Sequence, residues 1–184
     1  TQDYSIRIPE SNSTEMNRLA DEINELLSHI EKENMYEKEK QRHLKELAEC
    51  DPLTGINNKK AIELKMLAMV QNAMDNREII SVGFLDIDDF RDYNTNFGHQ
   101  EGDNVIKFVA DILKNNLKGE VGRNGGDEFV FAYEGAIDRN EIEEIIKKVH
   151  IELNKGYQSE GMDKTRPVPC SIGVVTVKGG IMDY

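Results

Sequence analysis

Hydrophobic residues near the start of the chain recur at alternating intervals of three and four. The apolar positions are Met16, Leu19, Ile23, Leu26 and Ile30. This spacing is typical of the a and d positions of a coiled coil. Polar residues interrupt it over 33–40, and Leu44 and Leu47 restore it. The pattern predicts one long helix from about Thr14 to about residue 50. Because a lone helix with so little to bury is marginally stable, the stripe favours a dimeric stalk over a solvated helix packed on its own domain.

From Asp51 the pattern becomes that of a globular domain. Helical spacing of apolar residues predicts helices over 59–75, 105–117 and 138–155. Short β-branched runs predict strands over 79–85 and 168–177. The segments 121–123 and 128–133 flank Asn124-Gly125-Gly126-Asp127. That turn predicts a hairpin, because glycine supplies the positive φ that tight turns require. Helices alternating with strands and one hairpin indicate an α/β fold with a sheet of mixed direction.

Charge and cysteine usage restrict the function and the compartment. The 184 residues suffice for one domain with an appendage, and 23 Lys and Arg against 35 Asp and Glu give a net charge of −12. A nucleic-acid or anionic-membrane surface needs a cationic face, so this balance argues against both. Cys50 and Cys170 are too few for a disulfide framework, which favours a reducing compartment. With no apolar run of membrane-span length and no signal peptide, we expect a soluble, cytoplasmic chain.

Two acidic turns lie next to predicted core strands. Asp86-Ile87-Asp88-Asp89 follows the strand over 79–85, and Gly125-Gly126-Asp127-Glu128 forms the hairpin turn. Open α/β sheets present ligands at the carboxyl ends of strands, although Asp is also common there as a helix cap. Two such turns can share one or two divalent cations. Hard oxygen ligands favour Mg²⁺ or Mn²⁺, and such sites usually act on phosphates.

Four motifs cover most of residues 51–177: Asp51-Pro52-Leu53-Thr54-Gly55-Ile56-Asn57-Asn58, Phe84-Leu85-Asp86-Ile87-Asp88-Asp89-Phe90, Asn94 with Phe97-Gly98-His99 and Gly102-Asp103, and Gly125-Gly126-Asp127-Glu128-Phe129. In these motifs and in their order, the chain resembles the GGDEF family, the diguanylate cyclases. The resemblance implies an α/β fold with an antiparallel-containing sheet wrapped by helices, similar to the adenylyl cyclase and polymerase palm. It divides the chain into a signalling coiled-coil helix over 1–50 and a GGDEF domain over 51–184.

The resemblance also implies a reaction. Two GTP molecules are joined into cyclic di-GMP with release of two pyrophosphates, one GTP being held by each domain of a homodimer. By resemblance, Asp86, the carbonyl of Ile87 and Asp127 hold Mg²⁺ or Mn²⁺, which aligns an in-line displacement. Asp127 or Glu128 helps to deprotonate the 3′-hydroxyl, and the sequence does not divide that role between them. Arg91 stands where the family usually has a phosphate-contacting Lys.

Other residues match positions that contact the nucleotide. Asn94 and Asp103 match the residues that read guanine, and their amide and carboxylate suit its donors and acceptors. Phe90 is expected beside the substrate. His99 matches a position that lines the nucleotide site, with capping of local backbone as the alternative. Asp88 is expected to cap the following helix rather than to bind metal.

The chain departs from the family in two places. Many relatives carry an inhibitory product site, Arg-x-x-Asp, where this chain has Asn116-Leu117-Lys118-Gly119. We therefore predict no product inhibition through this site. The family also continues past its last strand into a helix with a phosphate-gripping Lys and Arg, and that pattern is absent before Tyr184. We expect this C-terminal helix to be missing and GTP binding to be weaker without it.

Two segments stand out in the N-terminal region: Ser5-Ile6-Arg7-Ile8-Pro9 and Thr14-Glu15-Met16-Asn17-Arg18-Leu19. They resemble the second half of a HAMP signalling module, the first being similar to the end of its connector and the second to the start of its second helix. This implies a membrane receptor with its spans upstream and a full-length protein anchored in the inner membrane.

The leading hypothesis is a diguanylate cyclase output domain that dimerises through its N-terminal helix. A degenerate domain that binds GTP without catalysis and acts as a regulatory module is the alternative from another class. A cyclase of mixed purine products is a third reading, which Asp103 disfavours.

Overall fold

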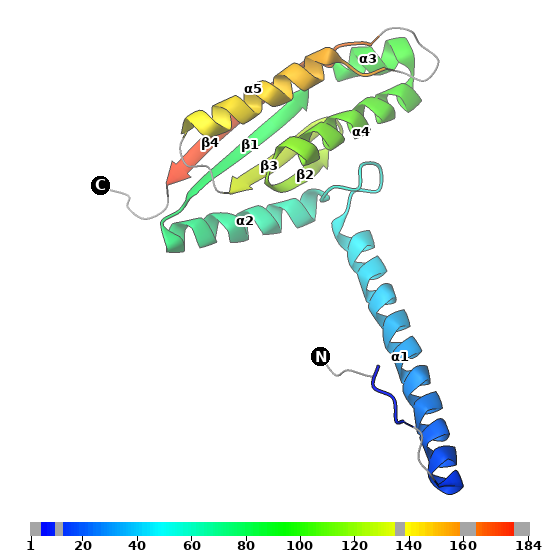
Figure 1. The fold of residues 1–184 in the computed structure, drawn as a ribbon. Coiled ribbons are helices and arrows are strands. Elements are labelled where there is room, and N and C mark those ends of the chain that lie inside the picture. Colours follow the sequence, from blue (N-terminus) through cyan, green and yellow to red (C-terminus); the bar gives the residue numbers. More distant parts are fainter. Residues whose placement is uncertain (1–4, 10–12, 135–138, 159–164, 179–184) are drawn as a thin grey trace. The chain divides into compact units, whose positions relative to one another are not determined.

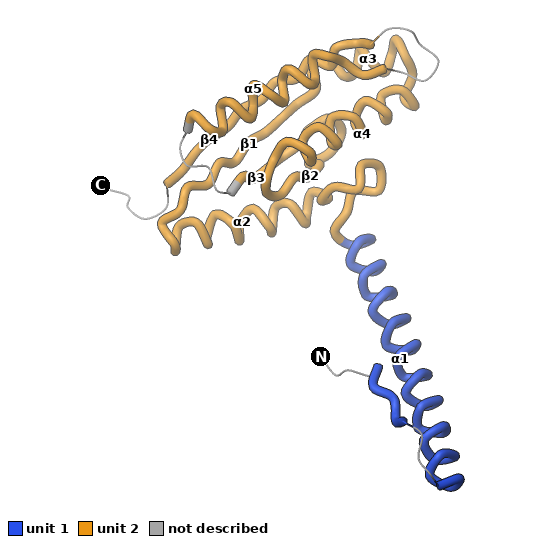
Figure 2. The backbone as a smooth tube through the Cα atoms, viewed as in Figure 1, with its two compact units in different colours: residues 1–48 blue, residues 49–184 orange. Residues whose placement is uncertain are grey.

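The structure is a computed structural model that describes residues 5–9, 13–134, 139–158 and 165–178. It divides into two compact units, residues 1–48 and 49–184 (Figure 2).

The first unit consists of a long helix and a short extended segment beside it (Figure 1). Helix α1 spans Thr14–Glu49, which confirms the predicted long helix. Residues 5–9 lie along it: the Ile8 amide donates to Asn24 Oδ1 at 2.8 Å, and Asn24 Nδ2 donates back to the Ile8 carbonyl at 3.0 Å. Arg7 reaches the Glu31 carboxylate at 2.7 Å. The side chains of the predicted apolar stripe are largely exposed along α1, for example Leu26 at 58% and Leu47 at 67%.

The second unit is built on a four-stranded sheet. Its strands are β1 (Ile79–Ile87), β2 (Gly119–Gly125), β3 (Glu128–Glu134) and β4 (Cys170–Lys178), in the order β2-β3-β1-β4. Each neighbouring pair of these strands is antiparallel. The described residues contain one parallel pairing, an isolated bridge between Asn57 and Gly122, so the expected mixed direction is confined to that bridge.

Helices cover both faces of the sheet (Figure 1). Helix α2 (Lys59–Asn76) covers one face, and α4 (His99–Asn116) and α5 (Arg139–Lys155) cover the other. Helix α3 (Phe90–Phe97) packs against α4. Because side chains alternate along a strand, β1 serves two cores. Leu85 and Ile87 pack with α4 and α5, whereas Ile80 packs against α2 through Ala73. The larger core includes Phe129 and Phe131, which are fully buried. This two-sided packing fixes β1 and β3 side by side, and so it fixes the turn that follows β1 next to the turn that precedes β3.

Candidate functional site

Antiparallel pairing brings the two acidic turns together. The carboxyl end of β1 meets the start of β3, where Asp86 and Glu128 are direct partners across the strands. Asp127 lies in the turn just before β3, and its carbonyl accepts from the Ile87 amide at 3.4 Å. The turn itself needs glycine, because Gly126 has φ +55°. Residues about 40 positions apart in the sequence thus share one edge of the sheet.

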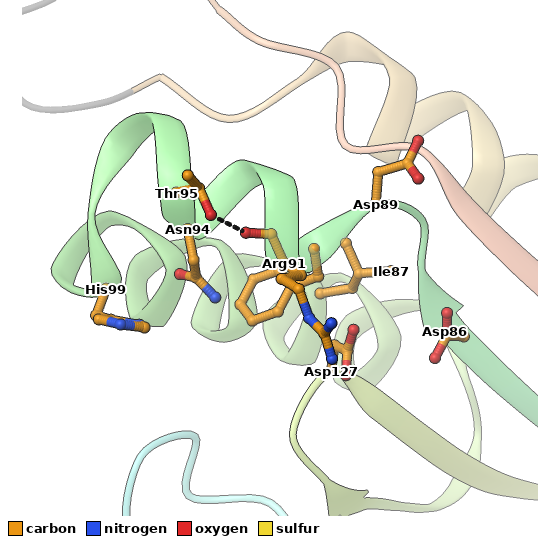
Figure 3. Close-up of a pocket in the computed structure, with 9 residues that line it drawn as sticks. Asp86, Ile87, Asp89, Arg91, Asn94, Thr95, His99 and Asp127 are labelled. Atoms are coloured by element: carbon orange, nitrogen blue, oxygen red, sulfur yellow. Dashed lines mark hydrogen bonds between the residues drawn. The ribbon is translucent and has the colours of Figure 1, made fainter.

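A cavity of about 510 Å³ opens at this edge (Figure 3). It is lined by Asp86, Ile87, Asp89, Phe90, Arg91, Asn94, Thr95, His99 and Asp127. Strand β1, the turn before β3, helix α3 and the start of α4 therefore each contribute side chains. All the predicted site residues line this cavity except Glu128 and Asp103.

Glu128 and Asp103 lie beside the cavity rather than in its wall. The Glu128 carboxylate accepts from Asn124 Nδ2 at 2.8 Å and lines a neighbouring hollow with Ser171 on β4. Asp103 is half-buried on α4, one helical turn beyond His99. The structure therefore places Asp127, and not Glu128, in the cavity with the other predicted site residues.

The expected capping role of Asp88 is wrong. The N-cap of α3 is Asp89, which has φ +53° and makes no side-chain cap hydrogen bond. Asp88 is held instead toward β4: its amide donates to the Pro169 carbonyl at 3.0 Å, and its carboxylate accepts from Ser171 Oγ at 2.7 Å. Because β4 pairs with β1 up to Ile87, the residue after β1 is drawn to the neighbouring strand before the helix begins.

The carboxylates at this edge repel one another. The pKa of Asp86 is raised by partial desolvation and by the charges of Asp127, Glu128 and Asp88. A divalent cation would offset this repulsion, and Asp86, Asp127 and the Ile87 carbonyl are the hard oxygen donors that such a cation takes. Among the described residues, no group of three His, Cys, Asp or Glu side chains is arranged to hold a metal alone. The donors therefore fit a cation whose remaining ligands are substrate phosphates and water, which is the usual way Mg²⁺ is bound.

Arg123 on β2, which the sequence analysis missed, hydrogen-bonds to the backbone of the acidic turn. Its Nε donates to the Gly126 carbonyl at 2.8 Å, and its Nη1 lies 3.3 Å from Asp51 Oδ1. The same Asp51 oxygen accepts from the amide and the hydroxyl of Thr54, at 3.0 and 2.7 Å. The network ties the loop at the start of the second unit to the residue before Asp127. An arginine directly before a glycine-rich acidic turn was the available signal.

Residues 116–119, where many relatives have the inhibitory product site, make contacts within the fold instead. Asn116 Nδ2 donates to the Glu152 carboxylate at 2.8 Å and to the Ile112 carbonyl at 2.9 Å. Gly119 has φ +146°, and a Cβ built on it would overlap the Ala132 carbonyl oxygen. A side chain at residue 119 is therefore excluded by the β2–β3 pairing.

Comparisons with known proteins identify the family of this chain. Residues 48–182 match the sequence model of the family described as diguanylate cyclase, GGDEF domain. The chain belongs to the GGDEF family. Among curated relatives of this GGDEF chain, the diguanylate cyclase TpbB of Pseudomonas aeruginosa is 31% identical over 129 residues, which is 69% of this chain and 30% of that protein. The diguanylate cyclase DgcN of Escherichia coli is 30% identical over 164 residues, 85% of this chain and 40% of that protein. The chain thus spans less than half the length of these relatives.

Solved structures show the same fold. The coiled coil and GGDEF domain of DgcB from Caulobacter crescentus, in complex with c-di-GMP, aligns with a TM-score of 0.70 and 24% identity over 90% of this chain and 84% of that one. The GGDEF domain of DgcB alone, also in complex with c-di-GMP, aligns with a TM-score of 0.65 and 25% identity over 71% of this chain and 78% of that one. The predicted GGDEF fold with an N-terminal helix is confirmed. No described helix of this chain is long and apolar enough to span a membrane.

Proposed function

We propose that this GGDEF domain is a diguanylate cyclase that condenses two GTP molecules into cyclic di-GMP and releases two pyrophosphates. The observation that carries the proposal is the shared cavity. Asp86 and Asp127, from β1 and the turn before its neighbour β3, line it together with Arg91 and Asn94 from α3. Acidic, cationic and amide groups at one opening suit the triphosphate, its cation and the base of one nucleotide.

Each half of the reaction makes one bond and breaks one. The 3′-oxygen of one GTP attacks the α-phosphorus of the other, the bond from that phosphorus to the β-phosphate bridging oxygen breaks, and pyrophosphate leaves. The 3′-proton passes to a carboxylate. Asp127 is the favoured acceptor because it lines the cavity. Glu128, which lines the neighbouring hollow, is the alternative. Repeating the step with the roles exchanged closes the ring.

The cation that fits this site is Mg²⁺ or Mn²⁺, held by Asp86, Asp127 and the Ile87 carbonyl. When bound, it neutralises phosphate charge as the pyrophosphate leaves. Arg91 lines the same cavity and supplies a fixed positive charge toward the phosphates. Asn94, with Asp103 one helical turn beyond the cavity, is proposed to read guanine, while Phe90 and His99 border the nucleotide.

One cavity of this kind serves one GTP, so we propose that the active form is a homodimer. The supporting surface is the exposed apolar stripe of α1, where Leu19 is 50% exposed and Leu44 57%. A second copy of α1 would bury this stripe in coiled-coil fashion. The excess of acidic residues argues against polymeric nucleic acid as a partner. The HAMP-like segment supports a membrane-linked receptor upstream in the full-length protein.

The alternative function is a GTP-binding regulatory module without catalysis. The observation in its favour is that Glu128 and Asp103 do not line the cavity with Asp127. The two functions differ in a single outcome, the formation of product.

The test compares GTP consumption by Asp127→Ala, Asp86→Ala and Asp92→Ala with Mg²⁺ present. Asp92 is the matched control, because it lies exposed in the first turn of α3 but does not line the cavity. We expect the first two variants to lose turnover by at least about 100-fold, a loss typical of removing one group that stabilises transition-state charge, and Asp92→Ala to retain it. Full turnover by Asp127→Ala would overturn the site assignment.

A further inference from the structure

Helix α4 contains a buried glycine, Gly102, next to two residues that line the cavity. Gly102 is the fourth residue of α4, and its amide donates to the Gly98 carbonyl at 3.1 Å as in a regular helix. No positive φ requires glycine here. Glycine in a helix interior is less favourable than alanine, so the position carries a cost that backbone geometry does not explain.

The side chains of helix α3, which packs against α4, explain the glycine at residue 102. A Cβ built on Gly102 would overlap Asn94 Oδ1, would lie 2.9 Å from Asn94 Cγ, and would lie 3.1 Å from Phe90 Cζ. Both neighbours are on α3, and both line the cavity. The Asn94 amide thus occupies the space that any side chain at residue 102 would take, and Figure 3 shows this amide between His99 and Arg91.

The oxygen of the Asn94 side-chain carboxamide has no hydrogen-bond donor among the described residues. This atom, Oδ1, is buried. A buried acceptor without a donor would ordinarily turn toward water. Here the oxygen end lies against Gly102, which leaves the opposite, donor end of the carboxamide to face the cavity.

We propose that Gly102 is a positioning residue for base recognition: the missing side chain creates the recess that orients the Asn94 carboxamide toward the purine. The inference rests on the proposed function, because it takes Asn94 as a group that contacts guanine. Gly102 itself touches no substrate atom and acts through Asn94. A site that hydrogen-bonds one base discriminates strongly against another only when its polar groups are held in place.

The test measures binding of 3′-deoxyGTP and 3′-deoxyATP, which lack the attacking hydroxyl and cannot be cyclised. The proteins are the wild type, Gly102→Ala, Asn94→Ala and the double variant, with Asn115→Ala as a neutral, exposed control on the same helix. We expect Gly102→Ala to weaken 3′-deoxyGTP binding about tenfold, near the loss of one hydrogen bond, with 3′-deoxyATP unchanged. The double variant should bind like Asn94→Ala, because the displaced amide is already gone.

The outcomes distinguish failure of the positioning role from failure of the proposed function. If Asn94→Ala loses guanine preference and Gly102→Ala keeps it, the positioning role is wrong and the proposed substrate stands. Additive losses in the double variant also overturn it. If Asn94→Ala keeps full guanine preference, the assignment of Asn94 fails and the inference fails with it. Should Gly102→Ala not fold, the double variant decides: a folded double variant supports the overlap with the amide, and an unfolded one refutes it.

Discussion

Replacing Arg123 with Met is expected to destabilise the second unit by about 2–3 kcal/mol. The Arg123 and Asp51 side chains are each only 15% exposed. Breaking a buried pair by removing one partner costs roughly 3–5 kcal/mol, because the other charge remains buried. Here Asp51 keeps its two hydrogen bonds from Thr54, and the closest ion-pair contact of 3.3 Å is long, which places the cost below that range. The expected loss of about 2–3 kcal/mol includes the hydrogen bond from Arg123 to the Gly126 carbonyl.

Urea unfolding at pH 7, followed by the near-ultraviolet circular dichroism of the core tyrosines, measures this loss. Lys65→Met is the matched control: it removes an ion pair of 3.0 Å to Glu120 whose side chains are 37% and 35% exposed. Exposed pairs contribute about 0–1 kcal/mol. A domain with roughly 5–15 kcal/mol of stability remains folded in both variants. Equal losses in the two variants would refute the reasoning.

The pH dependence gives a second check on the same variant. Burial alone would raise the pKa of Asp51, but the hydrogen bonds from Thr54 and the charge of Arg123 outweigh it and lower the pKa. The contribution of the ion pair is therefore complete above the unfolded pKa of about 3.9 and is lost as the pH falls through the lower folded pKa. The difference between wild type and Arg123→Met should shrink below about pH 4, and a difference that stays constant to pH 3 would contradict the assignment.

Four further predictions concern single positions of the chain. Burial, with the nearby charges of Asp88 and Asp86, raises the pKa of Cys170 to about 12, so a thiol reagent at pH 8 should titrate Cys50 in the native protein and both cysteines only in urea. Gly119→Ala should destabilise the fold by roughly 2 kcal/mol or more in urea unfolding, because of the strained φ of Gly119 and the overlap of a Cβ with the Ala132 carbonyl. Because residues 116–119 lack the product-site pattern, added cyclic di-GMP should leave the wild-type rate unchanged. Leu26→Asp should shift the protein toward monomer in sedimentation velocity, whereas the exposed polar substitution Lys38→Asp should not.

Periodicity predicted most of the fold because the elements bury one face. The strand over 79–85 lies within β1 (Ile79–Ile87), and the helix over 105–117 matches α4 (His99–Asn116) except for its last residue and its missed first turns. The apolar positions of both elements form the main core. Helix α3 received no bounds, because its eight residues make only about two helical turns, too few for a repeating pattern. The nearly uniform antiparallel pairing was also not predicted. Alternating helices and strands favour parallel connections, and only the packed sheet fixes direction.

The site was predicted where chemistry is local and missed where it depends on neighbouring strands. Asp86 and Asp127 were assigned from motifs, and the sheet register brings them together. The role of Asp88 failed because its partner, Ser171, is 83 residues away on β4. Arg123 was overlooked for a similar reason, since its partner Asp51 is 72 residues away. Long-range pairs of this kind leave no periodic trace in a single sequence.

We propose that the carboxylates at the end of β1 and before β3 support condensation of two GTP molecules. The most direct measurement is the stoichiometry of products after incubation of the protein with GTP and Mg²⁺, by chromatography and mass spectrometry. We expect cyclic di-GMP with two pyrophosphates for each product molecule and none of either with Asp127→Ala. Bound GTP that is recovered intact from the wild type would contradict the account and would favour the regulatory module.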